Sequence, residues 1–180
     1  MNFKGVHVAD FGAFLPIVLK FEGGYVDDPD DPGGETNKGI TMATFRLCSH
    51  ELLGVAPTSD NLKALTNAQA GTIYKARYWD AIQGDSINLQ DLANIVCDFY
   101  VNAGTHATTL LQQVMNGMGA NLAVDGKIGP ASIQVLNGLD EKRVFRQYKQ
   151  GRIRYYQSLG QKYPRFLQGW LNRVNSFPDL

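Results

Sequence analysis

The sequence predicts a mainly α-helical fold with a small β element beside an acidic loop. Apolar residues recur at helical spacing in several segments, and they make up 44% of the 180 residues, as expected for a domain with a real core. An Asp-, Pro- and Gly-rich stretch over residues 27–34 must form a turn or loop. Gly39-Ile40-Thr41 is the one strand-like pattern near that loop.

The first expected helix precedes the acidic loop. It carries Phe14 and Phe21 on its apolar face, and it tolerates Pro16 if this residue lies in the first turn. Gly23 and Gly24 are expected to end it. The helix therefore leads directly into the acidic segment.

Further helices are expected in the middle of the chain. Thr66 and Gln69 have the spacing of a capping box and open a helix that continues through Tyr78. The apolar patterns around Phe99 and Leu111 predict two more helices. A glycine-punctuated connection over residues 117–130 follows and marks a plausible boundary between lobes.

The last third of the chain predicts three helices. Pro130 suits the first turn of a short one, and Asp140 caps a long one through Tyr156 that Gly151 weakens. The final helix follows Pro164. No internal repeat or flexible linker is recognisable.

Charge is distributed unevenly, although the formal net charge is zero. Residues 1–35 carry seven acidic residues and two lysines, whereas residues 141–180 carry nine basic and two acidic residues. An acidic start suits acid–base chemistry, and a basic end suits an anionic polymer or surface. A stripe recurs every three residues and either faces such a polymer or is a solvated helix face: Arg143, Arg146, Lys149 and Arg152. Because no nucleic-acid-binding motif accompanies it, no nucleic-acid partner is expected.

Cysteine content and hydropathy indicate the compartment. Cys48 and Cys97 lie in apolar segments and are read as two buried thiols rather than a disulfide. The start of the chain lacks the pattern of a signal peptide, and no apolar segment is long enough to cross a membrane. We therefore expect a monomer without membrane insertion that stays in the cytoplasm until it is released.

Glu22 is the strongest candidate for catalysis. It ends an apolar helix, where the negative end of the helix dipole and partial desolvation both raise the pKa of a carboxyl group. A raised pKa is what a general acid near neutral pH requires. Taken alone, Glu22 is more readily explained as an exposed residue at a helix end.

The loop after Glu22 offers a second acidic group. Glycoside cleavage needs one carboxyl to protonate the leaving oxygen and a second to stabilise the positively charged sugar or to activate water. Asp31 is our choice for this second role, with Asp30 as its rival, and Thr36 or Thr41 is expected to hold a water or orient a carboxylate. The remaining aspartates suit turn formation.

Metal and nucleophile patterns are absent from the sequence. A calcium loop that starts at Asp28 fails at its fifth and twelfth positions, Pro32 and Gly39. The three histidines have no metal-ligand spacing, and no Ser-His-Asp or Cys-His signature is recognisable. We therefore expect neither a cofactor nor a metal.

Four other residues are candidates for substrate binding. Tyr25, Trp79 and Tyr100 can stack on sugar rings, although core packing explains each one equally well. Asn102 can donate to an N-acetyl or hydroxyl group, or it can cap a helix end.

Several motifs together resemble glycoside hydrolase family 108. They are Glu22-Gly23-Gly24-Tyr25, Asp31-Pro32-Gly33-Gly34, and Thr36 with Gly39-Ile40-Thr41, followed by Tyr78-Trp79-Asp80 and Val101-Asn102-Ala103-Gly104. Downstream, residues 124–130 and 169–174 resemble the predicted peptidoglycan-binding domain that often follows. The resemblance implies a lysozyme-like α+β fold, with Glu22 as catalytic acid and Asp31 in the site.

The resemblance also implies an activity and a domain organisation. The activity is that of an N-acetylmuramidase, which hydrolyses the β-1,4 bond between N-acetylmuramic acid and N-acetylglucosamine of peptidoglycan, typically as a phage or prophage endolysin. A lytic transglycosylase and a non-catalytic wall-binding module remain as alternatives. We expect a catalytic region over residues 1–105 and a helical binding region over 106–180, packed together as one compact unit.

Overall fold

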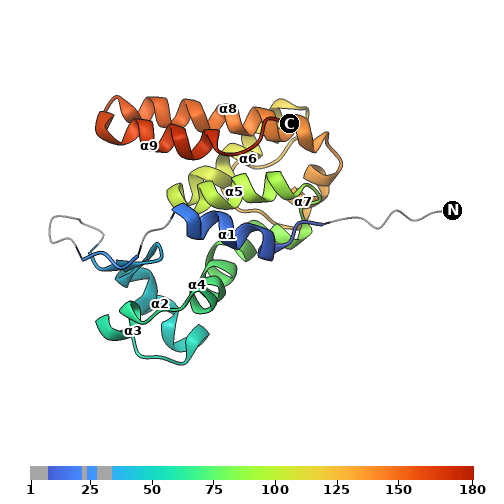
Figure 1. Cartoon of the computed structure of the whole chain (residues 1–180). Helices are drawn as coiled ribbons and strands as arrows, with labels where there is room; N and C mark the ends of the chain where they lie inside the picture. Colours follow the sequence, from blue (N-terminus) through green and yellow to red (C-terminus); the bar gives the residue numbers. More distant parts are fainter. Residues whose placement is uncertain (1–7, 22–23, 28–33) are drawn as a thin grey trace. The chain divides into compact units, whose positions relative to one another are not determined.

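The structure is a computed structural model that describes residues 8–21, 24–27 and 34–180 (Figure 1). It is mainly helical and has a two-stranded antiparallel sheet, which confirms the predicted fold class. The chain forms two compact units. We call Phe11–Tyr78 the N-terminal unit, and Trp79–Leu180 together with the segment before Phe11 the C-terminal unit.

The N-terminal unit combines four α-helices with the sheet in its described part. In chain order the elements are α1 (Phe11–Phe21), β1 (Thr36–Asn37), β2 (Ile40–Thr41), α2 (Met42–Leu53), α3 (Ser59–Lys63) and α4 (Asn67–Tyr74). A π-helical turn, η1 (Lys75–Trp79), ends this unit and begins the next.

Helix α1 packs against α4 at a position where α4 has no side chain. A Cβ atom on Gly71 of α4 would lie 2.9 Å from Cδ2 of Leu15, so only glycine admits this contact without a shift of Leu15. The helix begins at Phe11, and Pro16 therefore lies in its second turn rather than in the first as predicted. Pro16 is exposed, so the ring occupies solvent and not the core.

The predicted capping box at the start of α4 is confirmed. The Thr66 hydroxyl accepts from the Gln69 N–H at 3.2 Å, and the Gln69 side chain accepts from the Thr66 N–H at 3.0 Å. Helix α2, by contrast, was not predicted from the sequence. It begins after Thr41, whose hydroxyl accepts from the Thr44 N–H at 3.2 Å, and it buries Phe45 and Cys48.

The C-terminal unit contains two short 3₁₀ turns and five α-helices in its described part. In chain order they are η2 (Asp80–Ile82), η3 (Gly84–Ser86), α5 (Gln90–Ala103), α6 (Thr105–Gly117), α7 (Pro130–Asn137), α8 (Glu141–Gly160) and α9 (Pro164–Asn175). Helices α8 and α9 form an antiparallel pair, and α5 and α6 pack beside it (Figure 1). Asp140, Pro130 and Pro164 begin their helices as predicted.

The division into compact units falls at Trp79 and does not test the boundary between a catalytic and a binding region expected at residue 105. Helices α5 and α6 are separated only by Gly104, whose φ of +55° reverses the chain direction. Helix α5 packs on both α6 and α8, so it belongs to the same unit as these helices. The compact C-terminal unit therefore begins at Trp79, and whether the two units pack as one body stays a prediction.

A buried ion cluster connects three helices of the C-terminal unit. Asp98 on α5 is fully buried and accepts from Arg152 on α8 and from Arg173 on α9, with the Arg173 Nη2 to Oδ1 distance at 2.8 Å. The Arg152 guanidinium also lies 5.0 Å from the Phe99 ring centroid. We call Asp98, Arg152 and Arg173 the buried ion cluster.

The predicted basic stripe on α8 is not a single solvent face. Arg152 is fully buried in the ion cluster, and Lys149 is 6% exposed and donates to the carbonyls of Phe177 and Pro178. Arg143 and Arg146 are exposed. Each step of three residues falls about 60° short of a full turn, so residues nine apart lie on opposite sides of the helix.

The loop that connects α6 and α7 is fixed by buried side chains of α6. Gln112 accepts from the Gly126 N–H at 2.8 Å and donates to the Lys127 carbonyl at 3.0 Å, while the Thr108 hydroxyl donates to the Gly126 carbonyl at 2.7 Å. Gln112 also donates to the Asp125 carboxylate, and this hydrogen bond together with that of the Lys127 N–H lowers the Asp125 pKa. The Val124–Pro130 motif therefore has a structural role.

Both cysteines are buried and free, which confirms the prediction of two thiols. Burial raises the pKa of each thiol, so the reactive thiolate form is disfavoured. Across the described residues, no helix is both long and apolar enough to cross a membrane.

Candidate active site

The candidate site begins where α1 ends. Glu22 and the aspartates 30 and 31 lie outside the described residues, so the structure assigns no geometry to these three side chains. The described chain on either side consists of α1, which ends at Phe21, and the segment from Gly24 to Asp27. The sequence therefore places the candidate acid between a helix end and the residues that join the sheet.

The segment after Glu22 pairs directly with the sheet. The N–H and the carbonyl of Val26 each form a 2.8 Å hydrogen bond with Thr36, so Val26 adds a single antiparallel bridge to β1. Strands β1 and β2 pair Thr36 with Thr41 and Asn37 with Ile40. The three short segments therefore form one small β region beside the candidate acid in sequence.

The structure brings Thr36 and Thr41 together. As directly opposed residues they lie on one face of the sheet, and both are partly exposed. The Met42 N–H donates to the Glu35 carbonyl at 2.7 Å, so the ladder hydrogen bonds flank this pair, and such pairs have the closer side chains. The Thr36 hydroxyl donates to the Gly34 carbonyl at 3.3 Å, whereas Thr41 caps α2.

The opposite face of the sheet is anchored by residues that the sequence analysis missed. The buried Asn37 amide donates to the Leu62 and Lys63 carbonyls at 2.8 and 3.0 Å, which caps the end of α3. Tyr74 on α4 donates to the Lys38 carbonyl at 3.0 Å. The two residues that connect the strands, Lys38 and Gly39, both have positive φ, as a type I′ turn requires. For this turn, the glycine at its second central position, Gly39, was the available signal.

Tyr25 is half-buried within the same region. The Lys63 ammonium lies 4.9 Å from the centroid of its ring and therefore covers one face. Its buried hydroxyl makes no hydrogen bond to the described residues. Any stacking on a sugar ring must use the other face of Tyr25.

Trp79 is a core residue of the C-terminal unit. It is fully buried, and its indole N–H donates to the Asp85 carboxylate at 2.7 Å. A Cβ atom on Gly84 would lie 2.3 Å from the indole ring, so one ring face is covered by backbone. This burial favours core packing over the sugar-stacking role that the sequence left open.

Tyr100 and Asn102 lie in the last turn of α5 but do not share a face. Residues two apart on a helix point to nearly opposite sides. Asn102 is exposed, and its amide donates to the Asp98 carbonyl at 2.6 Å, which matches the alternative of a polar group at a helix end. Tyr100 is half-buried.

Sequence comparison identifies the class of protein. Residues 15–104 match the family described as Glycosyl hydrolase 108, and residues 106–175 match the one described as Predicted Peptidoglycan domain. The first match covers the whole candidate site and the second covers helices α6 to α9. The chain is thus a glycosidase whose catalytic region is followed by a predicted peptidoglycan-binding region. It belongs to glycosyl hydrolase family 108, as the sequence motifs predicted.

A solved structure resembles the chain over nearly its whole length. The structure of Brucella abortus SagA has 28% sequence identity and a TM-score of 0.69, with 93% of this chain and 94% of the other covered. No curated protein sequence matches the chain. The two family matches and this similarity indicate an enzyme that acts on peptidoglycan.

Proposed function

We propose that the chain is an N-acetylmuramidase that hydrolyses the β-1,4 bond between N-acetylmuramic acid and N-acetylglucosamine. The observation that carries this proposal is the paired threonines, Thr36 and Thr41, on a small sheet that follows the Glu-Gly-Gly-Tyr motif within the family match. Val26 joins that sheet four residues after Glu22 in the sequence. The acid and the two hydroxyls are therefore close to one another along the chain.

The proposed mechanism divides the chemistry between two groups. Glu22 donates its proton to the glycosidic oxygen as the bond to the sugar anomeric carbon breaks. Asp31, with the hydroxyl of Thr36 or Thr41, stabilises the positively charged sugar or orients the attacking water. The water oxygen bonds to the anomeric carbon, the proton that this water loses passes to the enzyme or to solvent, and Glu22 is reprotonated for the next cycle.

The test of the acid is Glu22→Gln, which keeps the size of the side chain and removes its proton. We expect the variant to fold and to lose at least about a hundredfold of the turbidity-clearing rate on purified peptidoglycan, as removal of a general acid does. Glu51→Gln is the matched control, because it makes the same change of a carboxyl to an amide at an exposed position of α2 outside the candidate site. Activity of Glu22→Gln equal to that of Glu51→Gln would overturn the role of Glu22.

The reaction itself is tested by analysis of the released fragments. Reduction with borohydride followed by mass spectrometry should show fragments that end in reduced N-acetylmuramic acid. Reduced N-acetylglucosamine ends would identify the other glycosidic bond. Anhydro ends, which borohydride does not reduce and which are lighter than the reduced ends by one water and two hydrogens, would identify a lytic transglycosylase, and binding without release of any ends would identify a non-catalytic module. Each of these three outcomes contradicts the proposal.

The second acid is tested by comparing Asp31→Asn with Asp30→Asn. We expect the larger loss of turnover in Asp31→Asn, with little change in stability for either variant. A larger loss of turnover in Asp30→Asn would identify Asp30, and not Asp31, as the second acidic group.

The biological role that we propose is lysis of a bacterial cell by an enzyme of phage or prophage origin, which reaches the wall after its release from the cytoplasm. Expression of the protein inside a bacterium should leave the cells intact until the inner membrane is permeabilised, and then lyse them. Lysis without permeabilisation would contradict this role.

A further inference from the structure

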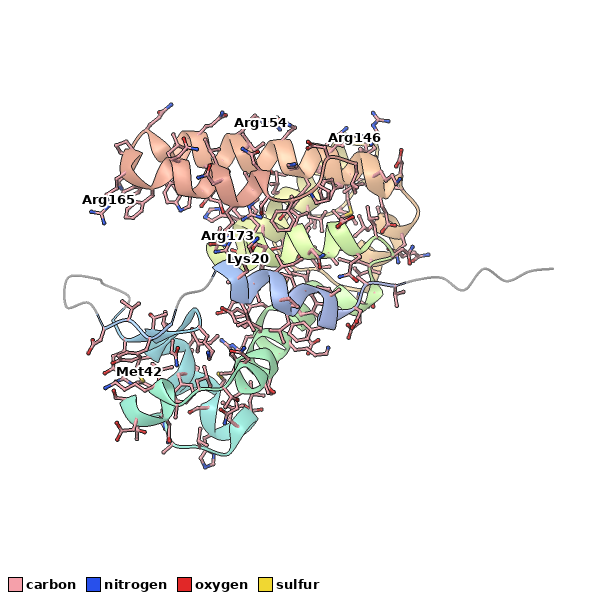
Figure 2. All side chains as sticks on the ribbon, in the orientation of Figure 1. Lys20, Met42, Arg146, Arg154, Arg165 and Arg173 are labelled. Carbon is pink, nitrogen blue, oxygen red and sulfur yellow. The ribbon has the colours of Figure 1, made fainter. Side chains whose placement is uncertain are left out.

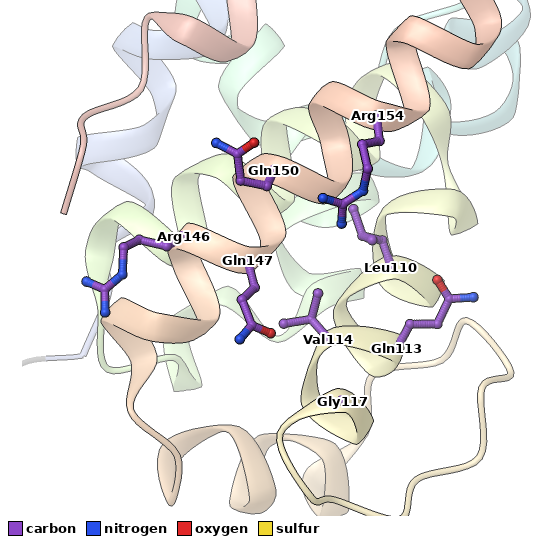
Figure 3. Close-up of a pocket in the computed structure, with 8 residues that line it drawn as sticks. All are labelled: Leu110, Gln113, Val114, Gly117, Arg146, Gln147, Gln150 and Arg154. Carbon is purple, nitrogen blue, oxygen red and sulfur yellow. The ribbon is translucent and has the colours of Figure 1, made fainter.

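A groove of about 520 Å³ lies between α6 and α8 in the C-terminal unit. Figure 3 shows Arg154 and Gln147 extending from α8 toward α6, where Leu110 and Val114 form the apolar floor. In Figure 2, Arg146 and Arg154 extend from the outer side of α8, away from the core of this unit. We call this feature the α6–α8 groove, and its lining is Leu110, Gln113, Val114, Gly117, Arg146, Gln147, Gln150 and Arg154.

The spacing of residues on the two helices creates the groove. On α8, residues 146, 150 and 154 are four apart and therefore form one row along the helix, unlike the three-residue stripe predicted from the sequence. Gly151 faces α6, where a Cβ atom would lie 2.7 Å from Cδ1 of Leu110. The missing side chain lets the two helices approach closely, so Leu110 closes the bottom of the groove.

The chemistry of the lining is polar, cationic and free of carboxylates. Among the described residues, Arg154 has no hydrogen bond or ion pair, and neither do the amides of Gln113 and Gln147. Arg146 donates to the main-chain oxygen of Leu180 at 2.8 Å. The groove thus presents an uncompensated guanidinium and amides that can both donate and accept, next to a small apolar floor.

We propose that the α6–α8 groove binds the peptide stem of peptidoglycan. Its complementarity is threefold: Arg154 pairs with a free carboxylate of the stem, Gln113 and Gln147 bind its peptide groups, and Leu110 and Val114 contact its alanine methyl groups. A peptide-free glycan strand carries one lactyl carboxylate per N-acetylmuramic acid and N-acetyl amides, but it lacks the consecutive peptide groups and the alanine methyl groups of the stem. The inference rests on the proposed function, because it assigns the peptide part of the same substrate to a separate site.

The first experiment measures binding of a synthetic tetrapeptide stem to the full-length protein by titration calorimetry or NMR. Arg154→Gln should weaken binding roughly tenfold, the value expected for loss of a charge-assisted hydrogen bond. Arg143→Gln is the matched control, because it makes the same charge change at another exposed position of α8 outside the groove, and its affinity should stay within about twofold of wild type.

A second ligand identifies the group that Arg154 contacts. Amidation of the stem carboxylates should weaken binding to the wild-type protein by a similar factor, but it should have little further effect on Arg154→Gln. Equal loss for both proteins would overturn the pairing. Polyglycerol phosphate is tested in the same way. If its binding depends on Arg154 and binding of the peptide does not, the groove binds an anionic polymer instead, which also overturns the proposal.

Hydrolysis assays separate the failure of this inference from the failure of the proposed activity. Arg154→Gln should raise KM on intact peptidoglycan and leave kcat unchanged, and it should behave as wild type on glycan strands stripped of their peptides. If the wild-type protein cleaves neither substrate but binds the stem through Arg154, the activity fails and the binding site stands. If it cleaves both and Arg154→Gln binds the stem as wild type does, the groove inference alone is overturned.

Discussion

The hydroxyls of the two threonines in the candidate site differ in how much they contribute to the fold. Thr36 and Thr41 form one cross-strand pair, yet only Thr41 also caps a helix. The loss of the Thr41 hydroxyl therefore affects both stability and any chemistry, whereas the hydroxyl of Thr36 donates only to the Gly34 carbonyl among the described residues. This difference makes Thr36 the clearer probe of a catalytic hydroxyl.

Substitution Thr36→Val removes the hydroxyl and keeps the β-branched shape that suits a strand. We expect kcat on peptidoglycan to fall roughly tenfold, the equivalent of about 1.4 kcal/mol of transition-state hydrogen bonding, with the free energy of unfolding within about 0.5 kcal/mol of wild type. Thr41→Val should lose about 1 kcal/mol of stability with its cap, and Thr41→Ser should restore it. Unchanged turnover in Thr36→Val, measured by reducing-end release, would remove Thr36 from the site.

Among the helices, local sequence signals predicted the first residues of a helix better than they predicted which of its residues are buried. The Thr66–Gln69 capping box and Asp140 are short-range patterns, so they could be read from the sequence. Helix α2 was missed because its apolar face is narrow, with Phe45 and Cys48 three residues apart among polar neighbours. Its cap, Thr41, had been considered as a strand residue and as an active-site hydroxyl, but not as a helix cap. Burial of Arg152 and Trp79 depends on partners distant in sequence, which spacing alone does not reveal.

Helix α8 shows how a residue that weakens a helix can be retained for packing. Gly151 was expected to weaken this helix, and the structure gives its reason: Leu110 of α6 occupies the space that a Cβ atom would need. A Cβ atom on Gly169 of α9 would meet no described neighbour within 4 Å, so this glycine lacks the same constraint. The two glycines form a natural matched pair.

Substitution of each glycine by alanine tests this explanation. Gly169→Ala should raise the free energy of unfolding by about 0.5–1 kcal/mol through helix propensity. Gly151→Ala gains the same propensity but must displace Leu110, which costs about 1 kcal/mol or more, so its stability should equal or fall below that of wild type. Urea unfolding of both variants measures the difference. Equal stabilisation of the two would show that the α6–α8 contact relaxes without cost.

For the whole molecule, charge is organised differently from what its distribution along the sequence suggested. The basic end of the chain is divided between interior and surface: Arg152 and Arg173 neutralise the buried Asp98, whereas Arg154 remains on the surface. Asp179 shows the opposite environment, because its side chain is 98% exposed and pairs with Lys149. Part of the positive charge of the C-terminal unit therefore pairs with a buried carboxylate, and the exposed remainder is available for an anionic ligand.

The same substitution at these two aspartates separates the contributions of core and surface charge. Asp98→Asn leaves two guanidinium groups without their counter-charge inside the C-terminal unit, and we expect a loss of about 3–5 kcal/mol in the free energy of unfolding. Asp179→Asn removes the exposed partner of the buried Lys149, whose ammonium keeps its two carbonyl acceptors, and should cost no more than about 1 kcal/mol. Urea unfolding monitored by far-UV circular dichroism provides both values. A loss in Asp98→Asn as small as that in Asp179→Asn would mean that hydrophobic packing of α5, α8 and α9 holds this unit together without the ion cluster.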